Sequence, residues 1–386
     1  MKKPLFLFAC LAVLLAACGP AATTAAPATT APAASLAPAA TDTPTSQPTE
    51  AASPTATPSY PPEGYGPANF PAGVDPLTGL KVADPALLDR RPMVIKVQNL
   101  PRNSRPQWGL SLADIIFEYY TEEGTTRFAG VWYGSDAKQV GPIRSGRFID
   151  EDIVRGYKAV FAFGYAYVAE MDRFLNSEFA DRLVVEGSST PLTRYDPNGF
   201  NYLMVNTADL NTYATQKGIN GKQELNGMFF NLTAPAGGQP GTQAYVRYSS
   251  AIYNRWDYDP ASGTYLRFSD TADASNTAEQ YAQLTDRVNN QPIAADNVVF
   301  LYANHELYSP GIYDILLSGS GDAYALRDGQ IYKVKWQRAD TEVVSLTNAD
   351  GSPFAFKPGN TWFEVIGMNS TVKQTDQSWR FTHVMP

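Results

Sequence analysis

Apolar runs alternate with helical patterns along the chain between residues 92 and 217. Continuous apolar runs bounded by turn residues are typical of buried strands. They occur at 92–98, 115–120, 127–133, 159–165 and 183–185. Apolar residues at helical spacing, with suitable polar residues at the ends, occur at 145–156, 167–176 and 207–217. This alternation favours a mixed α/β layer sandwich.

Two of the predicted helices carry more specific expectations. Ser145 is the expected N-cap of the first, because a serine side chain accepts a hydrogen bond from the first helical turn. In the second, Val168, Met171 and Leu175 recur at helical spacing. These three side chains are therefore expected to face the core.

Beyond residue 225 the pattern changes to short runs rich in tyrosine, tryptophan and phenylalanine. These runs are separated by turn residues, which predicts a β-rich region. They lie at 228–232, 244–248, 254–258, 264–268, 297–303, 313–318, 322–327, 330–336, 343–346 and 361–366. Gly237, Gly238 and Gly241 lie at the expected boundary between the two regions. The predicted class is therefore α+β, with an N-terminal mixed α/β domain (63–235) followed by a β-rich C-terminal domain (236–386).

The N-terminus has the features of a bacterial lipoprotein signal. Lys2 and Lys3 precede an apolar stretch of about a dozen residues, too short to span a bilayer, which needs about 20. It ends in Leu-Ala-Ala-Cys, a lipobox whose cysteine, Cys18, is the expected lipidation site. The alternative is an ordinary cleaved signal peptide in which Cys18 is incidental. Residues 1–18 are thus the predicted signal peptide.

Residues 19–62 consist mainly of alanine, threonine, proline and serine. Such a segment buries too little apolar surface to offset its ordering entropy, so it is expected to be a disordered stalk. The expected location is extracytoplasmic, at the outer face of the cell membrane, with the lipidated N-terminus as the membrane contact.

Composition narrows the chemistry of the remaining chain. Its only cysteines, Cys10 and Cys18, lie in the export signal, which leaves the folded part without a disulfide or thiolate metal site. The formal charge of −8 argues against nucleic acid as a partner. The two histidines, His305 and His383, lie outside any nucleophile-elbow or HExxH pattern. We therefore predict no metal and no cofactor.

The best candidate site is the corner Gly141-Pro142-Ile143-Arg144-Ser145-Gly146-Arg147. Arginine guanidinium groups present fork-shaped donors that fit phosphate or carboxylate. Arg127, Arg144, Ser145 and Arg147 are the candidate anion- or ligand-binding residues, and Asp114, Glu118 and Glu123 are their candidate acidic partners. The alternative is structural, with the arginines paired to Glu118, Glu122 or Glu123 so that they pin the corner to the preceding hairpin.

Several motifs resemble those of the YerB-like bacterial lipoproteins. They are Asp75-Pro76-Leu77-Thr78-Gly79, Arg105-Pro106-Gln107-Trp108-Gly109, Glu123-Gly124-Thr125-Thr126-Arg127-Phe128, the Gly141–Arg147 corner and Pro358-Gly359-Asn360-Thr361-Trp362. The resemblance covers about residues 74–366. It implies an envelope lipoprotein of mixed α/β fold with a distinct C-terminal domain, a family of unknown function that carries no established catalysis.

The leading hypothesis is a non-catalytic, lipid-anchored module that binds a ligand or partner at the cell envelope, such as an anionic glycan or another envelope protein. The alternative is an enzyme acting on a phosphorylated envelope glycan or lipid-linked substrate. In that case Arg127, Arg144 and Arg147 would clamp the phosphate, with Glu118 or Asp114 as base or metal ligand. The catalytic residues stay unknown in either case.

Overall fold

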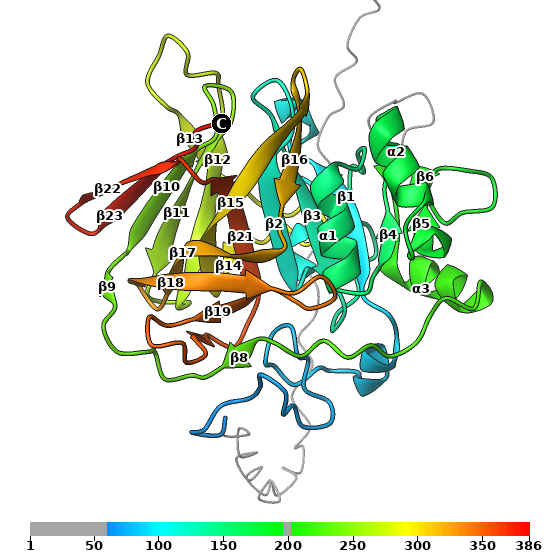
Figure 1. Ribbon diagram of the computed structural model, residues 1–386, viewed down its shortest axis with the longest axis horizontal. Coiled ribbons are helices and arrows are strands. Elements are labelled where there is room, and N and C mark those ends of the chain that lie inside the picture. Colours follow the sequence, from blue (N-terminus) through cyan, green and yellow to red (C-terminus); the bar gives the residue numbers. More distant parts are fainter. Residues whose placement is uncertain (1–59, 196–201) are drawn as a thin grey trace, which may run out of the picture. The chain divides into compact units, whose positions relative to one another are not determined.

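The computed structural model describes residues 60–195 and 202–386. The predicted signal peptide, Cys18 and the predicted stalk up to residue 59 therefore lie outside the described residues. The chain from Pro58 to Pro386 forms one compact unit. Its described part contains two large β-sheets, two small strand pairs and three α-helices (Figure 1).

The first sheet has 12 strands, most of them in the order β19-β18-β17-β15-β21-β2-β3-β1-β4-β5. Outside this order, β16 pairs with β15 and β9 pairs with β18. Its strands are β1 (Met93–Gln98), β2 (Ile115–Tyr120), β3 (Thr126–Trp132), β4 (Val160–Ala162), β5 (Leu183–Val184), β9 (Gln239–Pro240), β15 (Asn297–Ser309), β16 (Ile312–Leu316), β17 (Gly319–Arg327), β18 (Gln330–Arg338), β19 (Ser345–Thr347) and β21 (Thr361–Gly367). Strands from both sides of residue 235 thus share one sheet.

The second sheet has seven strands, in the order β13-β12-β11-β10-β23-β22 with β14 on β12. Its strands are β10 (Gln243–Arg247), β11 (Tyr253–Asp259), β12 (Thr264–Asp270), β13 (Tyr281–Gln283), β14 (Ala294–Ala295), β22 (Thr371–Thr375) and β23 (Ser378–Thr382). The small pairs are β6 (Thr193–Arg194) with β7 (Leu203–Met204), and β8 (Phe229–Phe230) with β20 (Ala355–Phe356).

The α-helices lie in the N-terminal part of the described chain, between strands β3 and β8 in sequence. They are α1 (Phe148–Gly156), α2 (Val168–Leu175) and α3 (Thr207–Gln216), with the short 3-10 helices η1 (Pro85–Asp89), η2 (Arg102–Ser104), η3 (Leu110–Leu112) and η4 (Ala180–Arg182). A mixed sheet with three helices, followed by a β-rich second sheet, confirms the predicted α+β class.

Both faces of the first sheet are covered, which explains its continuous apolar strands. Along β2, Phe117 belongs to the core shared with helix α1, whereas Ile116 belongs to the core shared with the second sheet. The period of two in a strand assigns alternate residues to these two cores. Figure 1 shows α1 in front of β1, β2 and β3, and the second sheet beside them.

Two expectations about the helices need correction. Of the three side chains expected to face the core, Met171 packs against it, but Val168 and Leu175 are 62% and 57% exposed, and α2 also buries Glu170 and Phe174. Glu170 turns inward because its carboxylate accepts a hydrogen bond from the Tyr167 N–H (3.0 Å) and lies near a buried arginine. Ser145 is not an N-cap either.

Between the two sheets lies a buried cluster of charges. Arg267 of β12 donates from Nη2 to Glu118 Oε2 (2.5 Å) and from Nη1 to Glu364 Oε1 (3.0 Å). Glu118 and Glu364 are direct neighbours on β2 and β21, so both carboxylates face the second sheet. The guanidinium also stacks over the Trp362 ring at 4.4 Å. One arginine therefore joins the two sheets through two fully buried acids.

Glu364 makes stability depend on pH. Burial and the neighbouring Glu118 carboxylate raise the pKa of Glu364 to about 8 from 4.5, against the opposing charge of Arg267. The Tyr248 hydroxyl lies 3.0 Å from Glu364 Oε2 and 3.1 Å from the Glu118 carbonyl, and it can donate to either oxygen. The folded state then binds the extra proton, so its contribution to stability is present below the unfolded pKa and is lost as the pH rises through the folded pKa.

We expect the free energy of unfolding of the wild-type protein to fall, relative to Glu364→Gln, between about pH 5 and about pH 8. Glutamine has no titrating proton, so the difference in the free energy of unfolding between wild type and Glu364→Gln reports the titration of Glu364 alone. Urea denaturation at both pH values measures it. Glu279→Gln is the control: burial raises the pKa of Glu279, but hydrogen bonds from Tyr281, Arg247 and Arg380 outweigh this and lower it. A flat difference for Glu364→Gln would contradict the assignment.

Candidate functional site

The hairpin between β2 and β3 places one acid at the site. Its turn is closed by the Thr125 N–H, which donates to the Glu122 carbonyl at 2.9 Å, and Glu123 and Gly124 take left-handed conformations (φ 53° and 76°). Glu122 points toward the corner segment, whereas Glu123 is exposed. The turn therefore presents Glu122, and not Glu123, to the arginines.

The corner segment is extended and fixed by backbone hydrogen bonds. The Arg144 N–H donates to the Lys96 carbonyl (3.0 Å), and the Gly164 N–H donates to the Arg144 carbonyl (2.9 Å). At Gly141 (φ 147°) a Cβ atom would lie 2.8 Å from the Met204 sulfur, so only glycine fits there. Helix α1 begins only at Phe148, which leaves Arg147 as its N-cap residue in place of Ser145.

Glu122 bridges two of the three candidate arginines. Arg147 donates to both carboxylate oxygens of Glu122, with Nε 2.7 Å from Oε2. Arg127 Nη2 donates to Oε1 at 3.2 Å, and Arg127 Nη1 donates to the Ser145 carbonyl at 3.0 Å. Burial raises the pKa of Glu122, but the hydrogen bond from Arg147 and the arginine charges outweigh it and lower that pKa. Glu122 is thus held ionised.

Arg144 differs from the other two arginines. In residues 60–195 and 202–386, no hydrogen bond or ion pair is found for its half-buried guanidinium group. It lines a pocket of about 170 Å³ together with Arg127, Glu122 and Glu123. Burial and the charge of Arg147 lower the pKa of Arg144. This pocket therefore presents an unpaired cation beside a second arginine.

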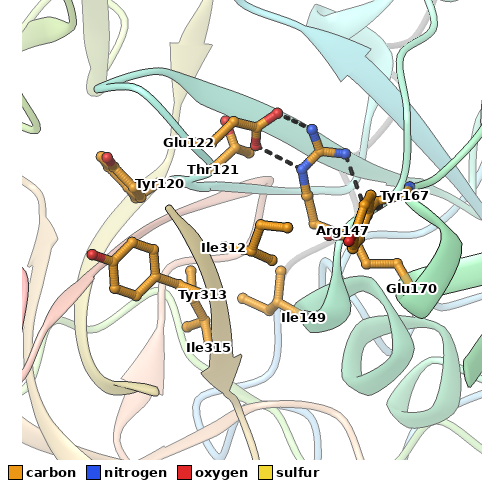
Figure 2. Close-up of a pocket in the computed structure, with 10 residues that line it drawn as sticks. All are labelled: Tyr120, Thr121, Glu122, Arg147, Ile149, Tyr167, Glu170, Ile312, Tyr313 and Ile315. Carbon is orange, nitrogen blue, oxygen red and sulfur yellow. Dashed lines mark hydrogen bonds and ion pairs between the residues drawn. The ribbon is translucent and has the colours of Figure 1, made fainter. Parts of the chain in front are cut away.

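A larger cavity of about 300 Å³ is also lined by Glu122, together with Arg147 (Figure 2). Its polar end is formed by Thr121, Glu122, Arg147 and Glu170. Its remaining lining is apolar or aromatic, namely Tyr120, Ile149, Tyr167, Ile312, Tyr313 and Ile315. Glu122 therefore lines both this cavity and the pocket of Arg127 and Arg144.

A buried polar triad behind the arginines was missed by sequence reasoning. Lys96 Nζ lies 3.0 Å from Asp150 Oδ2, and the Tyr119 hydroxyl contacts both groups. Burial lowers the pKa of Lys96 to about 7, although Asp150 opposes this effect. Asp150 also accepts the Arg147 N–H (2.6 Å) and so caps α1. A lysine in the middle of an otherwise apolar strand was the available signal.

The other predicted acidic partners lie elsewhere. Glu118 is in the buried cluster with Arg267 between the sheets. Asp114 accepts from the backbone N–H groups of Tyr133 (2.5 Å) and Gly134 (3.0 Å). Burial raises the pKa of Asp114 to about 6 despite these bonds. Of the acids considered from sequence, Glu122 therefore pairs with Arg127 and Arg147, while Glu123 only lines the pocket of Arg127 and Arg144.

Three remaining features are the two histidines, the possible metal-binding groups and the possible membrane-spanning helices. His305 and His383 are buried side by side, with ring centroids 5.1 Å apart. Burial lowers their pKa values to about 4 and about 3, so both rings are neutral near pH 7. Among the described residues there is no group of three His, Cys, Asp or Glu side chains suited to hold a metal ion. No helix in this part of the chain is long and apolar enough to cross a membrane.

Two sequence models of one family match this chain. The N-terminal domain described as "Protein of unknown function (DUF3048)" matches residues 77–228, and the C-terminal domain of the same description matches residues 244–363. The chain belongs to the DUF3048 family. The DUF3048 description assigns no activity, so the chemistry of the site has to be argued from its residues.

The resemblance to YerB-like proteins is confirmed over 75% of this chain. A Bacillus subtilis (strain 168) protein named "Putative lipoprotein YerB" is 29% identical over 305 residues, which are 75% of this chain and 85% of that protein. The crystal structure of YerB from Bacillus subtilis has a TM-score of 0.65 at 26% identity, and the match covers 76% of this chain and 96% of that one. The similarity thus spans both DUF3048 regions.

Proposed function

We propose that this protein is a lipid-anchored, extracytoplasmic envelope protein that binds an anionic ligand at Arg127, Arg144 and Arg147 without catalysing a reaction. Cys18 carries the lipid and residues 19–59 form the stalk. The name of the Bacillus subtilis relative supports the lipoprotein assignment. The ligand in this proposal is an anionic component of the cell envelope that carries a phosphate or carboxylate group.

The observation that carries the binding proposal is the unpaired guanidinium group of Arg144. A half-buried arginine without an acid has lost part of its hydration and gains most from an incoming anion. Arg127 lies in the same pocket and can contribute a second donor. Phosphate and carboxylate groups match such paired forks.

The surroundings of the acids support binding over catalysis. An enzyme acting on a phosphorylated substrate needs a carboxylate free to act as base. Glu118 is paired with Arg267 and Asp114 with two backbone N–H groups. Glu122 is the acid near the arginines, and their hydrogen bonds hold it ionised against the effect of burial. An acid paired in this way is a poor proton acceptor.

Arg144→Gln should weaken the binding of inorganic phosphate by about tenfold or more, because one charge-assisted hydrogen bond contributes about 1.5–3 kcal/mol. Isothermal titration calorimetry of the purified protein measures the change. Arg255→Gln is the matched control, since Arg255 is also partly exposed but pairs with Asp257 on β11. Phosphate binding that is indifferent to Arg144→Gln would place the site elsewhere. A wild-type protein that binds neither phosphate nor carboxylate would overturn the proposal.

A further inference from the structure

Glu122 occupies the position that an anionic ligand would take. Its carboxylate receives the two-pronged donation of Arg147 and a third hydrogen bond from Arg127. This is the geometry with which arginines bind a free carboxylate or phosphate. Glu122 is 33% exposed and lies on a hairpin turn, so a competing anion can reach it from solvent.

The charges around Glu122 favour a dianion over a monoanion. Arg127 and Arg147 are balanced by Glu122, and Glu170 adds a weaker contact to Arg147 at 3.6 Å. Arg144 adds an unbalanced positive charge in the pocket beside them. Once Glu122 is displaced, Arg127 and Arg147 lose the acid that they share, and Arg144 lines the pocket beside them. A phosphate monoester carries the second charge that this set can accept.

The cavity beyond Glu122 indicates what the phosphate is attached to. Its volume of about 300 Å³ is at the lower end of small-molecule sites, which span about 300–1,000 Å³. Ile149, Ile312 and Ile315 offer no hydrogen bonds to hydroxyl groups, and Tyr120 and Tyr313 add ring surface (Figure 2). An apolar or aromatic body fits this lining, whereas a sugar would leave its hydroxyl groups unpaired.

We infer that the ligand is a phosphate monoester of an apolar group, whose phosphate displaces Glu122 from Arg147 and Arg127 while its apolar body fills the adjoining cavity. Glu122 then acts as an internal competitor, because its carboxylate accepts the hydrogen bonds of Arg147 and Arg127 when no ligand is bound. This inference rests on the proposed function and specifies its ligand. The ester is either free in solution or part of a membrane lipid, and both present the same chemistry.

The competitor role is tested by Glu122→Gln with inorganic phosphate as the probe. Removing the internal charge should tighten phosphate binding by about tenfold, since one fewer charge-assisted contact must be broken. Glu279→Gln is the matched control, because Glu279 bridges Arg247 (2.8 Å) and Arg380 (2.9 Å) on the second sheet in the same manner. Equal gains in both variants would show a general charge effect and overturn the competitor role.

The apolar body is tested with phenyl phosphate and glucose 1-phosphate. Phenyl phosphate should bind about tenfold or more tightly than inorganic phosphate through burial of its ring, and glucose 1-phosphate should show no such gain. Ile312→Trp fills the cavity and should abolish the phenyl gain while leaving inorganic phosphate binding intact. An equal gain for the sugar ester, or a phenyl gain that survives Ile312→Trp, overturns the inference.

The two proposals fail in different ways. If inorganic phosphate binds in an Arg144-dependent manner but phenyl phosphate binds no better, the proposed function stands and the apolar ligand is wrong. If no anion binds to the wild-type protein or to Glu122→Gln, the binding function itself is wrong. Co-sedimentation with phosphatidylcholine vesicles, with and without phosphatidic acid, then separates a lipid source from a free ester.

Discussion

Replacing Arg267 with methionine should lower the free energy of unfolding by about 3–5 kcal/mol, because removing one partner of a buried ion cluster leaves uncompensated charge. Both Glu118 and Glu364 lose their only cation within hydrogen-bonding distance among the described residues. The stacking of the guanidinium over Trp362 is lost as well. Urea denaturation followed by circular dichroism measures the change.

Arg255→Met provides the comparison for Arg267. Arg255 lies on the neighbouring strand β11 and pairs with Asp257 at 2.7 Å, but both side chains are partly exposed. Its loss should cost less than about 1 kcal/mol. If Arg267→Met fails to fold, Arg267→Lys retains the charge and should give an intermediate loss. Similar, small effects for Arg267→Met and Arg255→Met would show that the cluster does not hold the sheets together.

Lys96→Met should also destabilise the fold by about 3–5 kcal/mol. The side chains of Lys96 and Asp150 are both fully buried, so the substitution leaves the Asp150 carboxylate without its cation. The double variant Lys96→Met/Asp150→Asn should recover part of this loss, because it removes the unpaired charge. Chemical denaturation of the two variants at equal pH provides the measurement.

Lys335→Met is the control for Lys96. Lys335 pairs with Asp322 on the surface of the first sheet, where both side chains are about half exposed or more. Its removal should cost less than about 1 kcal/mol. A Lys96→Met protein as stable as Lys335→Met would show that the buried Lys96–Asp150 pair contributes no more to stability than an exposed pair.

The local pattern of apolar residues predicts where the strands of this fold lie in the sequence, but it does not predict which strands pair with one another. The apolar runs of β1, β2 and β3 mark buried strands because both faces of the sheet are covered. No local signal shows that β21 lies between β2 and β15, since this pairing depends on residues far apart in sequence. The strand β22 was missed because its residues are polar and largely exposed. The strand β23 does alternate buried Trp379 and Phe381 with less buried residues, but at five residues its pattern is short.

The site shows the same division between local and distant information. The corner segment was found because Arg144 and Arg147 follow a glycine-proline turn, and the structure brings Arg127 beside them. The inward position of Glu170 on α2 was not predictable from helical spacing, because it is stabilised by Arg147 from another element. Lys96 was passed over because its partner Asp150 lies 54 residues away.

The position of β21 in the middle of the first sheet has a consequence for how the chain matures. Ile115 pairs with Thr361, so β2 lacks one of its two neighbours until nearly all of the chain has left the ribosome or crossed a membrane. Pairings of such long range form slowly, and an unpaired apolar strand is prone to aggregate. A chain that emerges N-terminus first therefore stays unfinished until its last residues arrive, which suits transport in an unfolded state and makes C-terminal truncation costly.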